Sequence, residues 1–475
     1  MRTDNHSQPL FTKCDQVLTV AQMRAAEQAL IVAGSSVDAL MQVAGHGAAA
    51  WIWRIAAQRR VTVLCGPGNN GGNGYVIAEA LREKGGHVQV IAGAEPKTAA
   101  AQQARTLFAG EVLGPDALVE GDILVDCLFG SGLTRALSAA HFALLSQLAA
   151  RHAIRIAIDL PSGMESDSGA ALNEGLPDYH LTLALGAWKQ AHFLMPAAAH
   201  MGALRLVPIG VEPVPGAAAV IRQPHLCAPV TDSHKYRRGL LGVIPGTMPG
   251  ATVLAAIAAQ HAGAGYVKLL DAGDARLPYD LVGDSASLAE AVQDHRLNAL
   301  LIGPGLGRHG TSLERLAIAL SSEVPLVLDA DALMLLTPRL LEEHTALVIA
   351  TPHEGELAAL EQSFGCTGGG SKADRASALA KASGMVIVAK GPDSVIAAPD
   401  GRVAFAPRAS AWLSTAGTGD VLAGAIASRL ATGASAYQAA CEGMWLHGEA
   451  ARLAGPVLTA SQLAETLRSA YAACL

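Results

Sequence analysis

Short, uninterrupted apolar runs recur along this chain, and they limit its fold more than any other feature. A run without polar alternation is typical of a strand that is buried on both faces. Alanine-rich stretches separate the runs, for example at 75–84 and 142–151. This alternation predicts α/β structure, with mostly parallel sheets and helices on both faces. The predicted strands are 61–65, 88–91, 123–125, 154–158, 181–185, 241–244, 266–270, 299–302, 326–328, 347–350 and 386–389.

Prolines crowd the middle of the chain and mark a predicted domain boundary. Proline fixes its own φ and lacks an amide hydrogen, so a proline-rich segment disfavours regular elements. The segment 207–229 separates the two series of predicted strands, and a length of 475 residues fits two large domains. We therefore expect two different α/β domains, at 1–222 and 223–475. The prolines are Pro208, Pro213, Pro215, Pro224 and Pro229.

Composition narrows the class of protein further. With 34 basic and 41 acidic residues the net charge is 34 − 41 = −7, which argues against a nucleic-acid binder. No apolar run reaches the roughly 18 residues that span a bilayer, and residues 1–20 lack the apolar core of a signal peptide. The seven cysteines form no C-x-x-C pair, which favours a reducing compartment. We expect a cytoplasmic protein with neither nucleic-acid nor membrane partners.

A glycine-rich segment follows the first predicted strand. Gly66, Gly68 and Gly71 match the G-x-G-x-x-G pattern that places a phosphate at a helix N-terminus. A dinucleotide site of that type also has an acid at the end of the next strand. Here that strand ends in Ile91-Ala92-Gly93, which disfavours a dehydrogenase. The additional asparagines indicate polar contacts with some other ligand, although a tight turn without a ligand stays an alternative.

Two more strand ends in the first half carry acids. Asp126 follows one predicted strand, and Asp159 follows the next, three residues before Ser162. Ligands in open α/β sheets lie beyond the carboxyl ends of the strands. Asn70, Asp126 and Asp159 with Ser162 are therefore expected to converge on one cleft. Either acid alone could instead be the N-cap of the following helix.

These three motifs, in this order, resemble the NAD(P)H-hydrate epimerase domain. The similarity covers most of residues 15–220 and implies a Rossmann-like three-layer domain that binds NADHX or NADPHX, the hydrated forms of the reduced cofactors. It implies that Asn70, Asp126 and Ser162 bind a potassium ion and that Asp159 is the acid/base residue. It also implies that two loops hold the substrate. Their residues are Asn69, Asn70, Gly71, Gly72 and Asn73 in one, and Gly130, Ser131, Gly132, Leu133, Thr134, Arg135 and Ala136 in the other. Asn73 stands where the family usually has Asp, which reduces the charge of the first loop.

In the second half, Thr415-Ala416-Gly417-Thr418-Gly419-Asp420 leads into a predicted helix. Backbone amides at such a helix start form an anion hole, and Asp420 would lie at its mouth. An anion hole with an aspartate base suits phosphoryl transfer to an alcohol. Glycines that merely cap helices are the alternative. Other polar clusters follow predicted strands, at 303–307, 329–333, 351–356 and 390–394.

Together these clusters resemble the ADP-dependent NAD(P)H-hydrate dehydratase domain of the ribokinase-like superfamily, over residues 230–455. The resemblance implies that the hydrate is contacted by Ala251, Gly305, His353 and Asp420. It implies that ADP, with Mg²⁺, is contacted by Lys390, Gly391, Pro392, Asp393, Ser394 and Gly419. Two segments depart from the family pattern. Pro245-Gly246 replaces Gly-Gly, and Pro392-Asp393-Ser394 replaces a small residue and Thr.

The domain order resembles the bifunctional NAD(P)H-hydrate repair enzymes. That resemblance implies epimerisation of R and S hydrates in the first domain. In the second domain it implies dehydration of the S form to NAD(P)H, with ADP converted to AMP and phosphate. We also expect a homo-oligomer. The rival hypothesis is a ribokinase-like kinase acting on a sugar or vitamin precursor, with a non-catalytic first domain that serves as a binding module.

Overall fold

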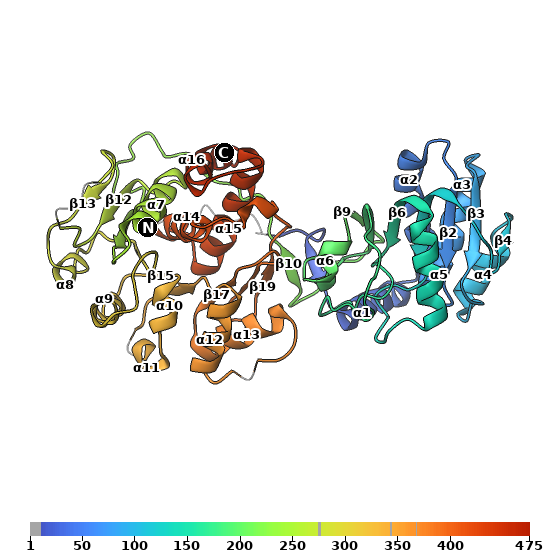
Figure 1. The fold of residues 1–475 in the computed structure, drawn as a ribbon, viewed down its shortest axis with the longest axis horizontal. Coiled ribbons are helices and arrows are strands. Elements are labelled where there is room, and N and C mark those ends of the chain that lie inside the picture. The colour runs from blue at the N-terminus through green and yellow to red at the C-terminus, as the bar shows by residue number, and fades with distance from the viewer. Residues whose placement is uncertain (1–10, 274–276, 343, 367) are drawn as a thin grey trace. The chain divides into compact units, whose positions relative to one another are not determined.

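The computed structural model describes residues 11–273, 277–342, 344–366 and 368–475. Residues 1–10, the first half of the segment expected to lack the apolar core of a signal peptide, lie outside the described residues. The chain forms two compact units, Met1–Ala219 and Val220–Leu475, coloured blue to green and green to red in Figure 1. The predicted boundary, at residue 222, lies in the same proline-rich segment as this division. Among the described residues, no helix has both the length and the apolar character needed to cross a membrane.

A parallel sheet of seven strands forms the centre of the first unit. Its order is β4-β3-β2-β5-β6-β7-β9, and every neighbouring pair is parallel. The chain first builds outward from β2 to β3 and β4 and then returns to place β5 on the other side of β2. Ligands bind at such a switch point, beyond the carboxyl ends of the strands. The strands are β2 (Val61–Cys65), β3 (Val88–Ala92), β4 (Val112–Leu113), β5 (Gly121–Cys127), β6 (His152–Ile158), β7 (Leu181–Leu185) and β9 (Ala203–Val207).

Each face of this sheet has its own apolar core, because successive side chains of a strand point to opposite faces. Val63 and Val125 pack with helices α2, α3 and α4, whereas Leu64 and Leu124 pack with α5. The burial of both faces explains why the strands read as uninterrupted apolar runs. The helices are α1 (Val20–Val32), α2 (Val37–Ala56), α3 (Asn69–Glu83), α4 (Ala99–Leu107), α5 (Ala139–Ala150), α6 (Ala197–His200) and the 3-10 turn η1 (Gln190–His192). Short strands β1 (Gln16–Leu18), β8 (Trp188–Lys189) and β10 (Ala218–Val220) complete the list.

The second unit also has a mainly parallel sheet, in the order β13-β12-β11-β14-β15-β16-β17-β18-β19. The pairs from β13 to β17 are parallel, and β18 and β19 add two antiparallel pairings. The strands are β11 (Leu240–Ile244), β12 (Tyr266–Leu269), β13 (Val282–Gly283), β14 (Ala299–Ile302), β15 (Leu326–Leu328), β16 (Val348–Ala350), β17 (Val386–Ala389), β18 (Val395–Ala397) and β19 (Val403–Phe405).

Helix α14 is the central helix of the second unit. It packs against α7 and α15 and against strands β14 and β15, and almost its whole length is buried. The helices are α7 (Pro249–His261), α8 (Leu288–Ala291), α9 (Gly310–Leu320), α10 (Asp331–Leu335), α11 (Pro338–Leu341), α12 (Glu354–Ser363), α13 (Lys372–Ser383), α14 (Thr418–Ala431), α15 (Ala436–Ala454), α16 (Ala460–Ala472) and the 3-10 turn η2 (Ala411–Leu413). The prediction of two α/β domains with parallel sheets is confirmed.

Two predicted features were wrong in detail. The helix after the first strand was expected from residue 75, but α3 begins at Asn69, so the second half of the glycine-rich segment is helical. Its glycines serve close packing: a Cβ on Gly72 would lie 2.5 Å from the Met41 methyl carbon, and one on Gly74 would lie 2.7 Å from Cys65 Sγ. The proline-rich segment was expected to lack regular elements, yet it contains β10.

Candidate active sites

The turn at Gly66–Gly68 brings the start of α3 against the loop after β5. A Cβ on Gly66 would lie 1.8 Å from the carbonyl oxygen of Leu128, and one on Gly71 would lie 1.9 Å from the Gly66 oxygen. Only glycine allows such approaches between backbones. The glycines of the motif therefore place Asn70, in the first turn of α3, beside the ends of β5 and β6.

Asn70 joins these strand ends through its side-chain amide. Its Nδ2 donates to the carbonyl oxygens of Phe129, at 3.0 Å, and of Ile158, at 3.1 Å. Its Oδ1 is buried and has no hydrogen-bond partner among the described residues. A buried carbonyl oxygen without a donor is unfavourable, so this atom indicates a missing positive partner.

Asp126 and Ser162 form the second part of this oxygen-rich cluster. Asp126 is fully buried and accepts from Leu128 N and Ser162 N, both at 3.0 Å, from Ser162 Oγ at 2.8 Å and from Tyr179 Oη at 2.5 Å. Burial raises the pKa of Asp126, although all four hydrogen bonds favour its charged form. Ser162 Oγ also lies 3.2 Å from the Phe129 oxygen that Asn70 contacts. The three predicted cation ligands are thus neighbours, and their oxygen chemistry fits a hard cation.

Asp159 has a strained backbone that several contacts hold in place. Its φ is +68°, a left-handed value that is uncommon for a residue other than glycine. Its Oδ2 accepts from Ser131 N at 3.0 Å, and its Oδ1 lies 2.5 Å from Lys189 Nζ. His192 Nε2 lies 2.8 Å from its backbone oxygen. The carboxylate therefore has a fixed position at the end of β6.

The ion pair with Lys189 sets the charge of this centre. Burial by itself raises the pKa of Asp159, but the charge and hydrogen bond of Lys189 outweigh it, and the net shift is downward. Burial and the charge of Lys189 lower the pKa of His192 to about 4. His192 is therefore neutral near pH 7, with its Nε2 hydrogen donated to Asp159 and its Nδ1 accepting from Lys189 N at 2.8 Å.

Sequence reasoning missed Lys189, His192 and Glu27. Burial raises the pKa of Glu27, and the charges of Lys189 and Asp159 also act on it, so Glu27 belongs to the same electrostatic cluster. A usable signal existed for two of the three, because Lys189 and His192 follow the predicted strand 181–185 at its carboxyl end. Glu27 lies in α1, where the sequence shows no such signal.

The two predicted substrate loops differ in how their residues are placed relative to Asp159. A Cβ on Gly130 would lie 3.0 Å from Asp159 Oδ2, so the second loop starts against the carboxylate, and most of the loop beyond Ser131 is exposed. In the first segment Asn69 is exposed and Asn70 lies at the cluster described above. Asn73 is buried within α3. Which of these residues contact a substrate stays a prediction.

In the second unit, the predicted anion hole is the N-terminus of α14. Gly417 is its N-cap with a φ of +90°, and Thr418, Gly419 and Asp420 form the first turn. Thr418 Oγ1 donates to the oxygens of Leu413, at 2.8 Å, and of Thr415, at 2.9 Å, so the preceding segment is fastened to the helix. Burial lowers the pKa of His447 to about 4, and its Nε2 lies 2.9 Å from the Thr418 oxygen.

Asp420 shares its environment with Asp329 and Lys390. Lys390 Nζ lies 2.6 Å from Asp329 Oδ1, which also accepts from Thr351 Oγ1 at 2.7 Å. Burial and the negative charge of Asp329 raise the pKa of Asp420 to about 6, and the charge of Lys390 opposes this shift. A carboxyl group with that pKa is mostly ionised at neutral pH and still basic enough to accept a proton.

Two loops meet near the start of α7. Gly305 has a φ of +68°, and a Cβ on it would lie 2.2 Å from the Met248 oxygen. Thr252 Oγ1 donates to the Pro304 oxygen at 2.9 Å. These contacts place Gly305 next to the first turn of α7, which holds Ala251. Two of the predicted hydrate contacts are therefore on adjoining segments.

His353 has a structural position. It is the N-cap of α12, and its Nδ1 accepts from Gly355 N at 3.0 Å and from Glu356 N at 3.2 Å. Its side chain is 62% exposed, and its Nε2 lies 3.3 Å from Glu356 Oε1. The cap explains why a histidine stands here, and the predicted contact with the hydrate stays a prediction.

The predicted nucleotide segment 390–394 forms a loop that is held by hydrogen bonds between its own residues. Ser394 Oγ accepts from Gly391 N at 3.0 Å and donates to the Gly391 oxygen at 2.8 Å. The buried carboxylate of Asp393 forms an ion pair with Lys372 of α13. Lys390 Nζ lies 3.5 Å from where a Cβ on Gly419 would be, so the loop reaches the N-terminus of α14.

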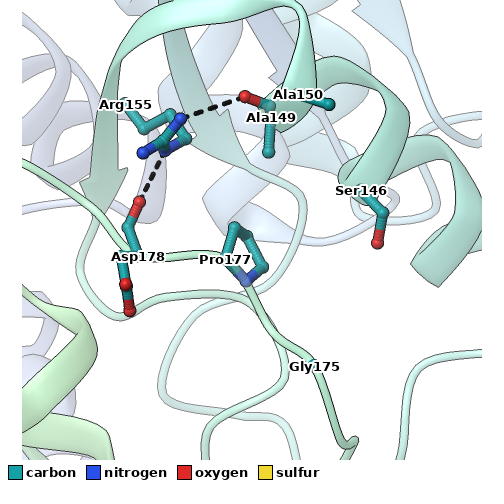
Figure 2. Close-up of a pocket in the computed structure, with 7 residues that line it drawn as sticks. All are labelled: Ser146, Ala149, Ala150, Arg155, Gly175, Pro177 and Asp178. Atoms are coloured by element: carbon teal, nitrogen blue, oxygen red, sulfur yellow. Dashed lines mark hydrogen bonds between the residues drawn. The ribbon is translucent and has the colours of Figure 1, made fainter.

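A cavity of about 280 Å³ lies in the first unit, and none of the predicted site residues lines it. Figure 2 shows Arg155 at its wall, reaching the backbone oxygens of Asp178 and Ala149. Its lining comes from the end of α5, from β6 and from the segment before β7, whereas Asp159 follows β6. We therefore do not include this cavity in either candidate site.

Each half of the chain matches a family model of known proteins. A family model described as NAD(P)H-hydrate dehydratase matches residues 241–471, and one described as YjeF-related protein N-terminus matches residues 37–191. A bifunctional NAD(P)H-hydrate repair enzyme of Thermosynechococcus vestitus is 32% identical, over 96% of this chain and 98% of the relative. The enzyme of that name from Mycobacterium leprae is 32% identical, over 96% and 99%.

The chain is also similar to solved structures. One is an ADP/ATP-dependent NAD(P)H-hydrate dehydratase from Bacillus subtilis, co-crystallized with ATP and Mg²⁺. It is 26% identical, with a TM-score of 0.45, over 53% of this chain and 95% of that chain.

Proposed function

The chain belongs to the family of bifunctional NAD(P)H-hydrate repair enzymes, and we propose that Asp159 serves its epimerase reaction and Asp420 its dehydratase reaction. The enzyme repairs hydrated NADH and NADPH. The first unit interconverts the R and S hydrates, and the second dehydrates the S form to NAD(P)H with ADP. The kinase hypothesis is not favoured, because the family model that covers the second unit is that of the dehydratase.

The dehydration proceeds by phosphorylation of the hydrate. Asp420 accepts the proton of the C6 hydroxyl, whose oxygen attacks the β-phosphorus of ADP, and AMP leaves. The phosphorylated carbinol then expels phosphate as the lone pair of the ring nitrogen forms an iminium ion at C6, and loss of a proton from C5 restores the dihydronicotinamide. Phosphate is a better leaving group than hydroxide at neutral pH. This difference is the chemical reason for using a nucleotide.

The first turn of α14 supports this step. Its amides face the charge that develops on the migrating phosphoryl group, and each well-placed donor lowers such a barrier by about 3–4 kcal/mol. The ion pair between Lys390 and Asp329 fixes the lysine near Gly419. Mg²⁺ typically binds through substrate phosphates and one or two carboxylates. Mg²⁺ would thus be held mainly through the phosphates of ADP.

Epimerisation at C6 needs a base that is ionised near neutral pH. Lys189 lowers the pKa of Asp159, and Ser131 N and Lys189 Nζ fix the two carboxylate oxygens. A potassium ion would be held by Asn70, Asp126 and Ser162, and it would supply positive charge beside the reacting hydroxyl. The unpartnered Oδ1 of Asn70 supports this assignment.

The observation that carries the proposal is the position of Asp420, in the first turn of a buried helix and beside Asp329 and Lys390. The test is incubation of the purified protein with mixed NADHX epimers, ADP and Mg²⁺, followed by chromatography of all products. We expect NADH, AMP and phosphate in equal amounts, and consumption of both epimers. A stable phosphorylated product would instead identify a kinase.

A further inference from the structure

The nucleotide segment contains a negative charge where phosphates are expected. Asp393 lies within residues 390–394, and a carboxylate opposes the binding of phosphate groups because like charges repel. Its side chain forms an ion pair with Lys372, the first residue of α13. Only 7% of the aspartate side chain and 12% of the lysine side chain are exposed, so water screens the pair weakly.

Lys372 does not stabilise its own helix, because it lies in the first turn of α13. A helix N-terminus carries a partial positive charge, which makes a cation in the first turn unfavourable. Helix α13 already has a capping box, in which Asp374 N donates to Ser371 Oγ at 3.2 Å and Ser371 N donates to the Asp374 carboxylate at 2.9 Å. The ammonium group instead reaches the loop after β17.

The ion pair between Lys372 and Asp393 also explains why residue 391 is a glycine. A Cβ on Gly391 would lie 2.6 Å from Lys372 Nζ and 2.9 Å from Asp393 Oδ1. The pair therefore occupies the space directly beside the backbone of residue 391. Because Lys390 Nζ is near Gly419, this backbone belongs to the loop that faces the N-terminus of α14.

We propose that Lys372 is a positioning residue of the nucleotide site, where it neutralises Asp393 so that the loop accepts the phosphates of a nucleoside diphosphate. This inference rests on the proposed ADP-dependent dehydration. It concerns a residue outside the motif and explains how the chain uses an aspartate within the segment. The lysine acts through Asp393 and need not touch the nucleotide.

Four variants test this role: Lys372→Met, Asp393→Asn, the double variant and Lys372→Arg. We expect Lys372→Met to raise the KM for ADP about tenfold or more, because it removes the lysine charge that opposes the buried carboxylate of Asp393 beside the phosphates. The kcat and the KM for the hydrate should change little. Asp393→Asn and the double variant should each have a lower KM for ADP than Lys372→Met, and Lys372→Arg should restore a KM near that of the wild type. Lys381→Met, at an exposed position in the last turn of α13, is the matched control for loss of one charge.

A merely structural pair gives a different pattern, since removing either partner would break it. Equal damage by Lys372→Met and Asp393→Asn would overturn the proposal, and so would a double variant that binds ADP as weakly as Lys372→Met. Calorimetry with ADP and Mg²⁺, without hydrate, measures the same affinities in the absence of turnover. If the wild-type protein binds ADP but converts no hydrate, the proposed function is refuted. The ADP affinities of the variants would then still test the role of Lys372. A wild-type protein that binds no ADP would overturn both.

Discussion

Lys189 Nζ lies 2.5 Å from Asp159 Oδ1, and the two side chains are only 1% and 9% exposed. A buried ion pair is a weak source of stability, because desolvation of both charges offsets their attraction. Because this buried pair also involves a residue with a strained backbone, we infer that it has a chemical role. Here the charge of Lys189 favours the ionised form of Asp159, whereas burial raises its pKa and favours the protonated form.

Lys189→Met should therefore change the pH dependence of epimerisation. Loss of the lysine raises the pKa of Asp159, because burial is then unopposed by a neighbouring cation. We expect the rate of R/S exchange near pH 7 to fall about 100-fold and to recover partly as the pH rises. The measurement is the exchange rate between pH 5 and 9, compared with that of Lys84→Met, which removes an exposed lysine. An unchanged pH profile would show that Lys189 does not control Asp159.

Asp159→Asn should separate the two activities. An amide cannot accept the proton, so R/S exchange should stop, whereas dehydration of the S form should continue at the rate of the wild type. Conversion of a mixed sample would then end when the S hydrate is consumed. The measurement is the final extent of conversion under conditions without spontaneous exchange. Complete conversion would refute the role of Asp159.

The cluster around Asn70 should make epimerisation depend on a monovalent cation. Potassium would satisfy the buried Asn70 Oδ1, which has no hydrogen-bond partner in the part of the chain that the structure describes. We expect exchange to be faster in KCl than in tetramethylammonium chloride of equal ionic strength, and we expect Asn70→Ala to abolish the difference. Dehydration of pure S hydrate by the same variant is the internal control for folding. Equal exchange rates of the wild type in both salts would contradict the assignment.

The acid limb of the dehydration rate should report Asp420. Since burial and Asp329 raise its pKa to about 6, the rate should fall as the pH drops through that value and the base becomes protonated. Asp329→Asn removes the neighbouring negative charge, so the limb should move to lower pH. The experiment is the pH profile of kcat for both proteins, with saturating ADP. A limb that stays in place or moves to higher pH would contradict the effect assigned to Asp329.

Much of the fold was predictable because its strands are buried on both faces. Such strands give uninterrupted apolar runs, and those at 61–65, 181–185, 299–302, 326–328 and 386–389 have the predicted bounds. The start of α3 was not predictable from local preference. Glycine is a poor helix former, and only packing against Met41 and Cys65 explains a helix through Gly72 and Gly74.

The candidate sites were predictable where a polar residue directly follows a strand. Asn70, Asp126 and Ser162 were expected to converge, and hydrogen bonds join them around Phe129. Lys189 also follows a predicted strand, but its ion pair with Asp159 depends on the pairing of β6 with β7, which sequence spacing does not reveal. Likewise, the capping role of His353 depends on side-chain geometry. The roles of the site residues in binding and catalysis stay predictions, and so does the expected homo-oligomer.

The most direct test of the account is Asp420→Asn. This variant should remain folded. Since Asp420 has a raised pKa in the folded state, its charged form costs stability as the pH rises above its ordinary value of 3.8, and its replacement should stabilise the protein at pH 8 by about 1 kcal/mol after allowance for solvent screening. Incubated with S-NADHX, ADP and Mg²⁺, it should form no NADH and release no AMP above background, while R/S exchange proceeds at the wild-type rate. ADP-dependent formation of NADH at a rate near that of the wild type would contradict the central claim.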